Sequence, residues 1–148
     1  MLYEVRFGYY CLKEALNIRK KLAESIGDKY YTEIAWTYRN LVNLLMWYNP
    51  DEISVEEIEQ NLIKAMEIYD YLEKYYPGQH ASSKSKTYIS YARVLLKYGK
   101  DRKEDALEYY KKAISINEVL NNDYPGLYEQ ELKDVLKEVE SLKITCKS

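Results

Sequence analysis

The residues AMEIYDYL at positions 65–72 carry a pattern that the chain repeats elsewhere. An alanine, an isoleucine three residues later and a leucine four residues after that also occur in ALNIRKKL at 15–22 and in AISINEVL at 113–120. Spacings of three and four residues place side chains on one face of a helix. The sequence therefore predicts a helical unit that recurs every 48–50 residues.

Each copy extends upstream as a stripe with spacings of four and three. The stripes are Gly8/Leu12/Ala15, Ile58/Leu62/Ala65 and Ala106/Tyr110/Ala113. The segments between them also correspond, because Tyr38/Leu41/Val42/Leu45 recurs as Tyr88/Tyr91/Ala92/Leu95. One helical hairpin cannot bury its own apolar face, so stacked neighbours must supply the core. We expect Ala15, Ala65 and Ala113 at helix–helix contacts.

Apolar residues follow helical spacing along almost the whole chain, and no segment shows the alternation of a strand. We predict an all-α fold, an α-α superhelix (solenoid) of antiparallel helix pairs with about six helices. The predicted helices are Leu2–Ser25, Lys29–Tyr48, Ser54 to about Tyr75, Ser82–Tyr98, Asp101 (as N-cap) to about Asn122, and Leu127–Cys146. One domain, 1–148, would hold a partial repeat 1–27, repeats 28–80 and 81–126, and a terminal helix 127–146.

Composition restricts the function classes. The 148 residues are 47% apolar with a net charge of −2, which argues against a nucleic-acid binder that neutralises phosphates. The longest apolar run, Leu44–Tyr48, is far shorter than the ~18 residues of a membrane span, and the N-terminus does not resemble a signal peptide. The two cysteines, Cys11 and Cys146, have no metal-ligand spacing. We expect a cytoplasmic protein with free thiols that binds neither nucleic acid nor membrane.

Catalytic motifs are not recognisable in the sequence. The only histidine, His80, falls in a predicted turn, which argues against a histidine-based triad or a multi-histidine metal site. Ser82, Ser83 and Ser85 are typical helix-start residues, and no glycine-rich loop has phosphate-binding spacing. We therefore expect no enzyme activity, no cofactor and no metal.

The repeated segments resemble the tetratricopeptide repeat. In that family the first helix carries a large residue, another large one three positions on, a small one next and a large one three further. Tyr88–Tyr91–Ala92–Leu95 fits this pattern, and Tyr38–Leu41–Val42–Leu45 is similar. The turn glycine falls on Gly99, with Asn49 at the other copy, and the second-helix pattern falls on Ala106, Tyr110 and Ala113. The long second helix and the YYPGQH turn at 75–80 look like the extended variant of kinesin light chains.

This resemblance implies a protein- or peptide-binding scaffold whose first helices line a concave groove. The groove positions would be Trp36, Arg39, Asn40, Asn43 and Met46 in one repeat, and Lys86, Ile89, Arg93 and Leu96 in the next. Three of these residues are cationic and none is acidic. The resemblance therefore suggests an extended or helical ligand with an acidic group.

The alternative is a structural or oligomerisation segment of a larger multidomain protein. The first predicted helix would then leave Phe7 and Tyr10 partly exposed, or would bury them against a second copy of the chain in a homodimer. The sequence does not choose between these two readings.

Overall fold

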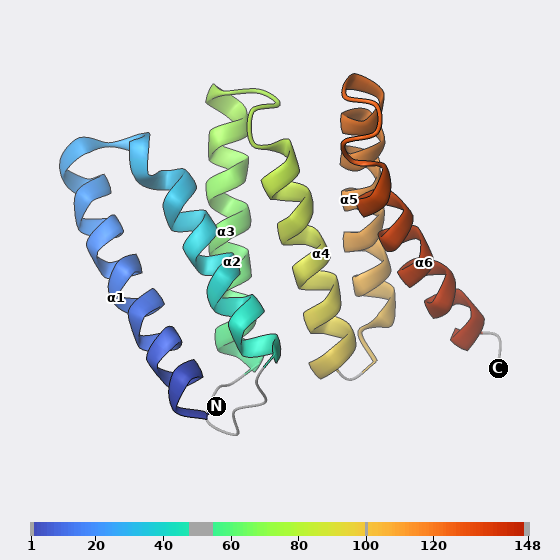
Figure 1. Ribbon diagram of the computed structural model, residues 1–148, viewed down its shortest axis with the longest axis horizontal. Helices are drawn as coiled ribbons and strands as arrows, with labels where there is room; N and C mark the ends of the chain where they lie inside the picture. Colours follow the sequence, from blue (N-terminus) through green and yellow to red (C-terminus); the bar gives the residue numbers. More distant parts are fainter. Residues whose placement is uncertain (1, 48–54, 100, 147–148) are drawn as a thin grey trace. The chain divides into compact units, whose positions relative to one another are not determined.

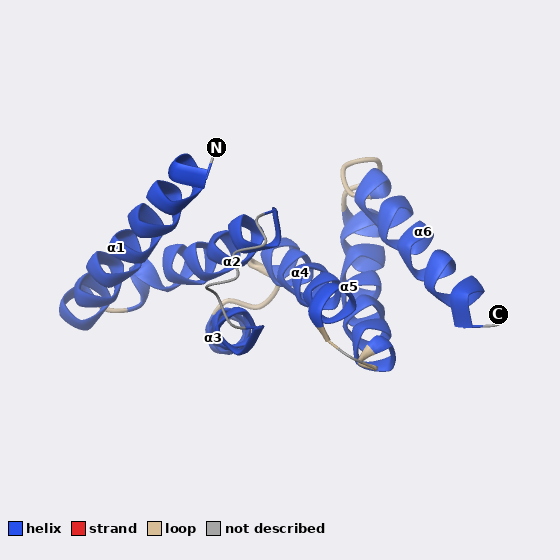
Figure 2. Ribbon diagram, turned by 90° about the horizontal axis from the view of Figure 1, so that it is seen from below, coloured by secondary structure: helices blue, strands red, loops and turns tan. Residues whose placement is uncertain are grey.

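The computed structural model describes residues 2–47, 55–99 and 101–146. Across these ranges it contains helices and turns but no strand, which confirms the all-α prediction (Figures 1 and 2). The α-helices are α1 (Leu2–Ile26), α2 (Tyr31–Trp47), α3 (Val55–Tyr75), α4 (Ala81–Tyr98), α5 (Lys103–Asp123) and α6 (Glu129–Cys146). A short 3-10 helix, η1 (Asp28–Tyr30), precedes α2.

The chain divides into two compact units at the boundary between the two predicted full repeats. Unit 1 is Met1–His80 and unit 2 is Ala81–Ser148. In unit 1, α2 packs against both α1 and α3. In unit 2, α5 packs against both α4 and α6. Consecutive helices within each unit are therefore neighbours, as the repeat pattern predicts.

The core of unit 1 draws on all three of its helices. Its buried residues are Leu16 from α1, Ile34, Ala35, Tyr38 and Leu41 from α2, and Ala65, Tyr69 and Leu72 from α3. The stripe Ile58/Leu62/Ala65 is almost completely buried, whereas the corresponding α1 residues Gly8, Leu12 and Ala15 are only partly buried. Residues at one pattern position therefore differ in burial between copies.

Unit 2 has a core of the same kind. Ala106, Tyr110 and Ala113 of α5 have 1% exposure or less, and Val135 and Val139 of α6 are also buried. Ala113 lies at the contact with α4, because the Ser85 hydroxyl donates a hydrogen bond to its carbonyl oxygen at 3.3 Å. The expected helix contact at Ala113 is confirmed.

The glycines of the two YPG turns both have a positive φ. Gly78 has φ 78° and Gly126 has φ 86°, values that side-chain-bearing residues rarely adopt. Gly27, predicted as the stop of the first helix, has φ 87°, and its N–H donates to the Ala23 carbonyl at 2.9 Å. Glycine is therefore required where α1, α3 and α5 end.

Two predicted helix starts were wrong. Asp101 is not the N-cap of α5, because Arg102 occupies that position without a side-chain cap and Asp101 has φ 55°. Asp tolerates this left-handed conformation better than most residues. Leu127, predicted to open the last helix, lies in the turn and is 70% exposed, and α6 begins at Glu129. The predicted start at Ser54 lies outside the described residues.

Candidate functional site

The predicted groove residues of α2 differ in their surroundings. Trp36 is 45% exposed, and the guanidinium carbon of Arg19 lies 5.7 Å from its ring centroid. Arg39 is partly buried, and no hydrogen-bond partner reaches its Nε or Nη1 within the part of the chain that the structure describes. Asn43 is exposed, whereas Asn40 and Met46 are partly buried. Trp36 and Asn43 thus remain accessible on α2.

The predicted groove residues of α4 are largely engaged by unit 2 itself. Arg93 donates from Nη2 to Glu138 Oε1 at 2.5 Å and from Nε to Oε2 at 3.1 Å. Lys86 Nζ lies 3.8 Å from Glu131 Oε2. Ile89 is 5% exposed, and Leu96 is partly buried. An acidic ligand at Arg93 would have to displace a carboxylate of α6.

Glu138 is the centre of a hydrogen-bonded cluster. The buried Tyr110 hydroxyl also donates to Glu138 Oε2, at 2.5 Å. Burial raises the pKa of Glu138, but hydrogen bonds from Arg93 and Tyr110 outweigh it and hold this pKa below its ordinary value. The pKa of Tyr110 is raised, first by burial and then by the adjacent carboxylate. The cluster joins all three helices of unit 2.

A second set of polar contacts also joins α4, α5 and α6. Ser85 donates to the Asn117 side-chain oxygen at 2.7 Å, and Asn117 Nδ2 donates to Glu131 at 3.3 Å. Ser85 and Asn117 are both fully buried. Because buried polar groups need partners, these bonds fix how α4, α5 and α6 pack.

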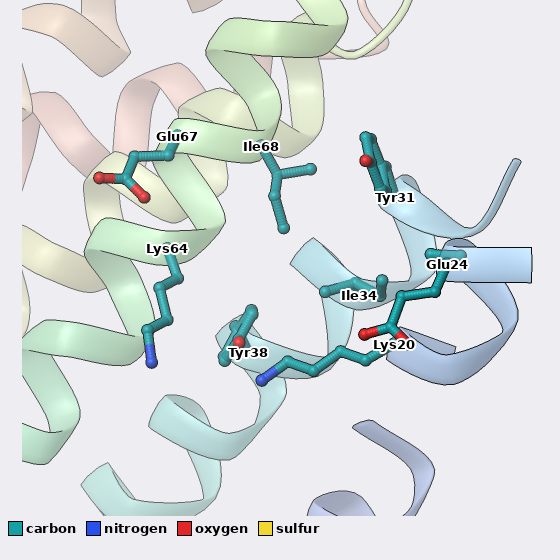
Figure 3. A pocket seen from close by; sticks show the side chains of 9 residues that line it. Lys20, Glu24, Tyr31, Ile34, Tyr38, Lys64, Glu67 and Ile68 are labelled. Carbon is teal, nitrogen blue, oxygen red and sulfur yellow. The ribbon is translucent and has the colours of Figure 1, made fainter. Parts of the chain in front are cut away.

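Unit 1 contains an open pocket of about 380 Å³ between its three helices (Figure 3). Its lining comes from α1 (Lys20, Ala23, Glu24), α2 (Tyr31, Ile34, Tyr38) and α3 (Lys64, Glu67, Ile68). Charged side chains thus surround a floor of aromatic and aliphatic ones.

Two lysines contact one aromatic ring in this pocket. Figure 3 shows Lys20 and Lys64 approaching Tyr38 from opposite sides. Their ammonium nitrogens lie 5.3 Å and 5.8 Å from the ring centroid, within cation–π range. Tyr38 itself is 3% exposed, so its position is fixed by the core.

The register between α1 and α3 explains why these lysines meet. Lys13 on α1 forms an ion pair with Glu57 on α3 at 2.7 Å, an offset of 44 positions. Just beyond the C-terminal end of α1, Asp28 of η1 accepts a hydrogen bond from the Tyr71 hydroxyl of α3 at 2.7 Å, an offset of 43. Two helices whose contacts keep nearly the same offset run in the same direction. Residues that differ by 43–44 therefore lie across from one another.

This register places the like charges of Lys20 and Lys64 at one ring, that of Tyr38, in the pocket. Lys20 and Lys64 differ by 44 positions, and Glu24 and Glu67 differ by 43. Among the residues that the structure describes, none of these four side chains forms an ion pair. The pocket therefore presents two cations without an ion-pair partner in that part of the chain, whereas the carboxylates of Glu24 and Glu67 point in different directions (Figure 3).

Hydrogen bonds join the elements around this pocket on either side of it along α3. At one end, Glu57 also accepts a hydrogen bond from Tyr9 at 2.7 Å, and its pKa is lowered by the hydrogen bonds from Lys13 and Tyr9. At the other end, the hydrogen bond to Asp28 raises the pKa of Tyr71 to about 12. The ring of Tyr71 also packs edge-on against Tyr31 at 5.3 Å. These contacts join α3 to α1 on one side of the pocket and to η1 and α2 on the other.

Sequence reasoning missed this pocket because the family resemblance directs attention to first helices, while the lysines lie on α1 and α3. A signal was present: Lys13 and Lys20 are seven residues apart, as are Glu57 and Lys64. Because the spacing is equal on both helices, the contact of Lys13 with Glu57 predicts that Lys20 lies across from Lys64. The first pair has opposite charges, whereas the second has like charges.

Comparisons with known proteins leave the family open. No protein-family model, curated protein or solved structure matches this chain. In the described ranges, no helix has the length and apolar character needed to cross a membrane. Those ranges also contain no group of three or more histidine, cysteine, aspartate or glutamate residues arranged to hold a metal ion.

Proposed function

We propose that the chain is a tetratricopeptide-type helical repeat module, a solenoid of antiparallel helix pairs, and that it binds a segment of another protein in the cytoplasm. The pocket of unit 1 carries this proposal. It combines an apolar floor, formed by Tyr38, Ile34 and Ile68, with charged side chains that lack ion-pair partners in the described chain. A few placed polar groups around an apolar surface are typical of ligand sites.

Aromatic side chains extend the pocket outward. Tyr31 lines it and packs against Tyr71, whose ring lies 4.7 Å from that of Tyr75. Tyr75 is 53% exposed. Tyrosine offers a large contact area and few rotatable bonds, so it is enriched in protein-binding surfaces. The surface available to a partner therefore extends beyond the pocket itself.

The test is selection from a phage-displayed library of 12-residue peptides against the whole chain. We expect specific peptides to be enriched and to bind in solution by fluorescence anisotropy. Ala23→Phe, which adds bulk inside the pocket, should abolish this binding while circular dichroism shows an unchanged helical fold. A library that yields no binder, or binders indifferent to Ala23→Phe, would contradict the proposal.

A second candidate function, association through α1, is favoured by one observation. Tyr3, Phe7 and Tyr10 have spacings of four and three and are 81%, 63% and 67% exposed. Such a stripe is the usual seam of a helix–helix interface. Under this alternative, sedimentation velocity should show a dimer that Phe7→Glu converts to monomer, whereas the binding proposal expects both proteins to sediment alike.

A further inference from the structure

We infer that the pocket of unit 1 binds one carboxylate of its partner segment between Lys20 and Lys64, beside the ring of Tyr38. The inference rests on the proposed function and names the chemical group that the pocket recognises. That carboxylate belongs either to an aspartate or glutamate side chain or to a chain terminus, two sources that the experiment distinguishes. The basis is the meeting of two ammonium groups at one ring without an ion-pair partner in the described chain.

The fold brings the two lysines to the same place. Their ammonium nitrogens lie 5.3 Å and 5.8 Å from the ring centroid of Tyr38, which they approach from opposite sides (Figure 3). Two like charges at one ring repel each other, and the attraction of the ring offsets that repulsion only in part. Each oxygen of a carboxylate can accept a hydrogen bond from one ammonium group. A carboxylate from a partner would therefore interact with Lys20 and Lys64 at once.

The described chain does not neutralise these lysines itself. Glu24 and Glu67 also line the pocket, but neither forms an ion pair with Lys20 or Lys64 within the described ranges. Both lysines lie more than one turn before the C-terminal ends of α1 and α3, and the stabilising effect of a helix dipole on cations is limited to the last turn. The two positive charges are thus left for a ligand.

Unit 2 repeats the lysine–tyrosine contact with an acid of its own nearby. Lys112 lies 5.7 Å from the ring centroid of Tyr88, and these residues have the pattern positions of Lys64 and Tyr38. Glu108 precedes Lys112 by four residues, the favourable orientation of an i,i+4 pair, whereas a neutral glutamine precedes Lys64 by the same distance. A carboxylate in the favourable position accompanies the contact in unit 2 but not in unit 1.

The composition of the lining favours a carboxylate beside an apolar residue. Two lysines and two glutamates line the pocket, so their formal charges cancel. A phosphate group of charge about −2 would be repelled by Glu24 and Glu67 more strongly than a singly charged carboxylate. Ile34 and Ile68 belong to the same lining and suit an apolar side chain next to the acid.

Two displayed peptide libraries, screened against the whole chain, distinguish the sources of the carboxylate. In the first library the peptide C-terminus is fused to the display protein, so that only side chains supply a carboxylate, and in the second the C-terminus is free. We expect an acidic residue to be enriched in the first or a free terminus to be required in the second. Conversion of that group to its amide in a synthetic peptide should weaken binding about tenfold. Peptides that tolerate this conversion would overturn the inference, whereas libraries without any binder would overturn the proposed function.

The protein variant Lys20→Gln/Lys64→Gln tests the two cations. It should bind a selected peptide about tenfold more weakly at low salt, and its affinity should depend less on salt than that of the parent. Urea unfolding should show a stability equal to or above that of the parent, because the change removes a repulsion. The matched control is Lys97→Gln/Lys112→Gln, which removes two exposed lysines that also contact tyrosine rings, and it should leave the affinity within about twofold. Equal losses of affinity in the two variants would overturn the inference.

The peptide change and the protein change together locate the carboxylate. If it lies between Lys20 and Lys64, the amide form of the peptide should bind the parent and Lys20→Gln/Lys64→Gln with the same affinity, because the interaction is already absent. Losses that simply add would place the carboxylate elsewhere on the chain and overturn the inference while leaving peptide binding established.

Discussion

The two units solve the same packing problem with opposite charge patterns. In unit 1, α1 and α3 correspond with an offset of about 44 residues, and there Lys20 meets Lys64 at the Tyr38 ring. In unit 2, α4 and α6 meet with an offset of 45, and there Arg93 meets Glu138. Charge complementarity is therefore satisfied at Arg93 in unit 2 but not at Lys20 and Lys64 in unit 1, although Lys13 and Glu57 pair elsewhere on the same two helices.

The difference shows why one surface is a better candidate for binding than the other. A groove whose charges are already paired within the protein binds a charged partner weakly, because the ligand must first displace the side chain that forms the internal ion pair. Arg93 already holds a carboxylate in the two-bond geometry that a ligand would use. Lys20 and Lys64 hold none within the described chain.

The largest expected effect on stability comes from enlarging a buried alanine of the helical core. Ala113→Leu should lower the free energy of unfolding by about 1–3 kcal/mol, because Ala113 has 0% exposure and contacts α4. The measurement is urea unfolding followed by circular dichroism. Ala15→Leu, at the same pattern position on α1, should cost less because Ala15 is only partly buried. Equal losses would show that the copies do not differ in packing as the structure indicates.

A smaller effect tests the charge cluster of unit 2. Glu138→Gln should lower the free energy of unfolding by roughly 1–2 kcal/mol, because Arg93 loses its anion and Tyr110 its charged acceptor. Half of the Arg93 side-chain surface is exposed, so water limits the loss. Glu140→Gln, an exposed change on the same helix, is the control and should be neutral. If the cluster does not contribute to stability, the two variants should have the same free energy of unfolding.

The same cluster should give unit 2 a pH dependence. The folded pKa of Glu138 lies below its unfolded value of 4.5, so its contribution is fully present above that pH and is lost as the pH falls through the folded pKa. The stability difference between the parent and Glu138→Gln should therefore shrink toward zero as the pH falls from above 4.5 through the folded pKa. Thermal melts across that range measure it. A difference that persists undiminished in acid would show that the charge of Glu138 is not what stabilises the cluster.

The fold was largely predictable because it depends on short-range periodicity. Stripes such as Ile58/Leu62/Ala65 repeat in the sequence, and the structure buries them. The start of α5 was not predictable from the preference of aspartate for N-caps, since Asp101 adopts a left-handed backbone conformation one residue before the N-cap, Arg102. The N-cap preference of a single residue does not predict the backbone conformation that the rest of the unit imposes on it.

The candidate site was less predictable than the fold. The sequence pointed to Arg93 as a ligand anchor, but its pairing with Glu138 depends on how α6 lies against α4, which no local pattern gives. Lys20 and Lys64 are ordinary surface residues in the sequence. They become a site only when the α1–α3 register sets them over one tyrosine ring.

The smallest predicted effect on stability tests the difference between the two units most directly. Glu67→Gln removes an exposed carboxylate that has no ion-pair partner in the described chain, so it should leave the free energy of unfolding unchanged or raise it by up to about 0.5 kcal/mol. The identical chemical change at Glu138 should lower it. Paired urea titrations of the two variants at low and high salt measure the difference, and salt should reduce any gain at Glu67 because the group is exposed. If Glu67→Gln instead destabilises the protein as Glu138→Gln does, Glu67 has an internal partner and the pocket is not left uncompensated.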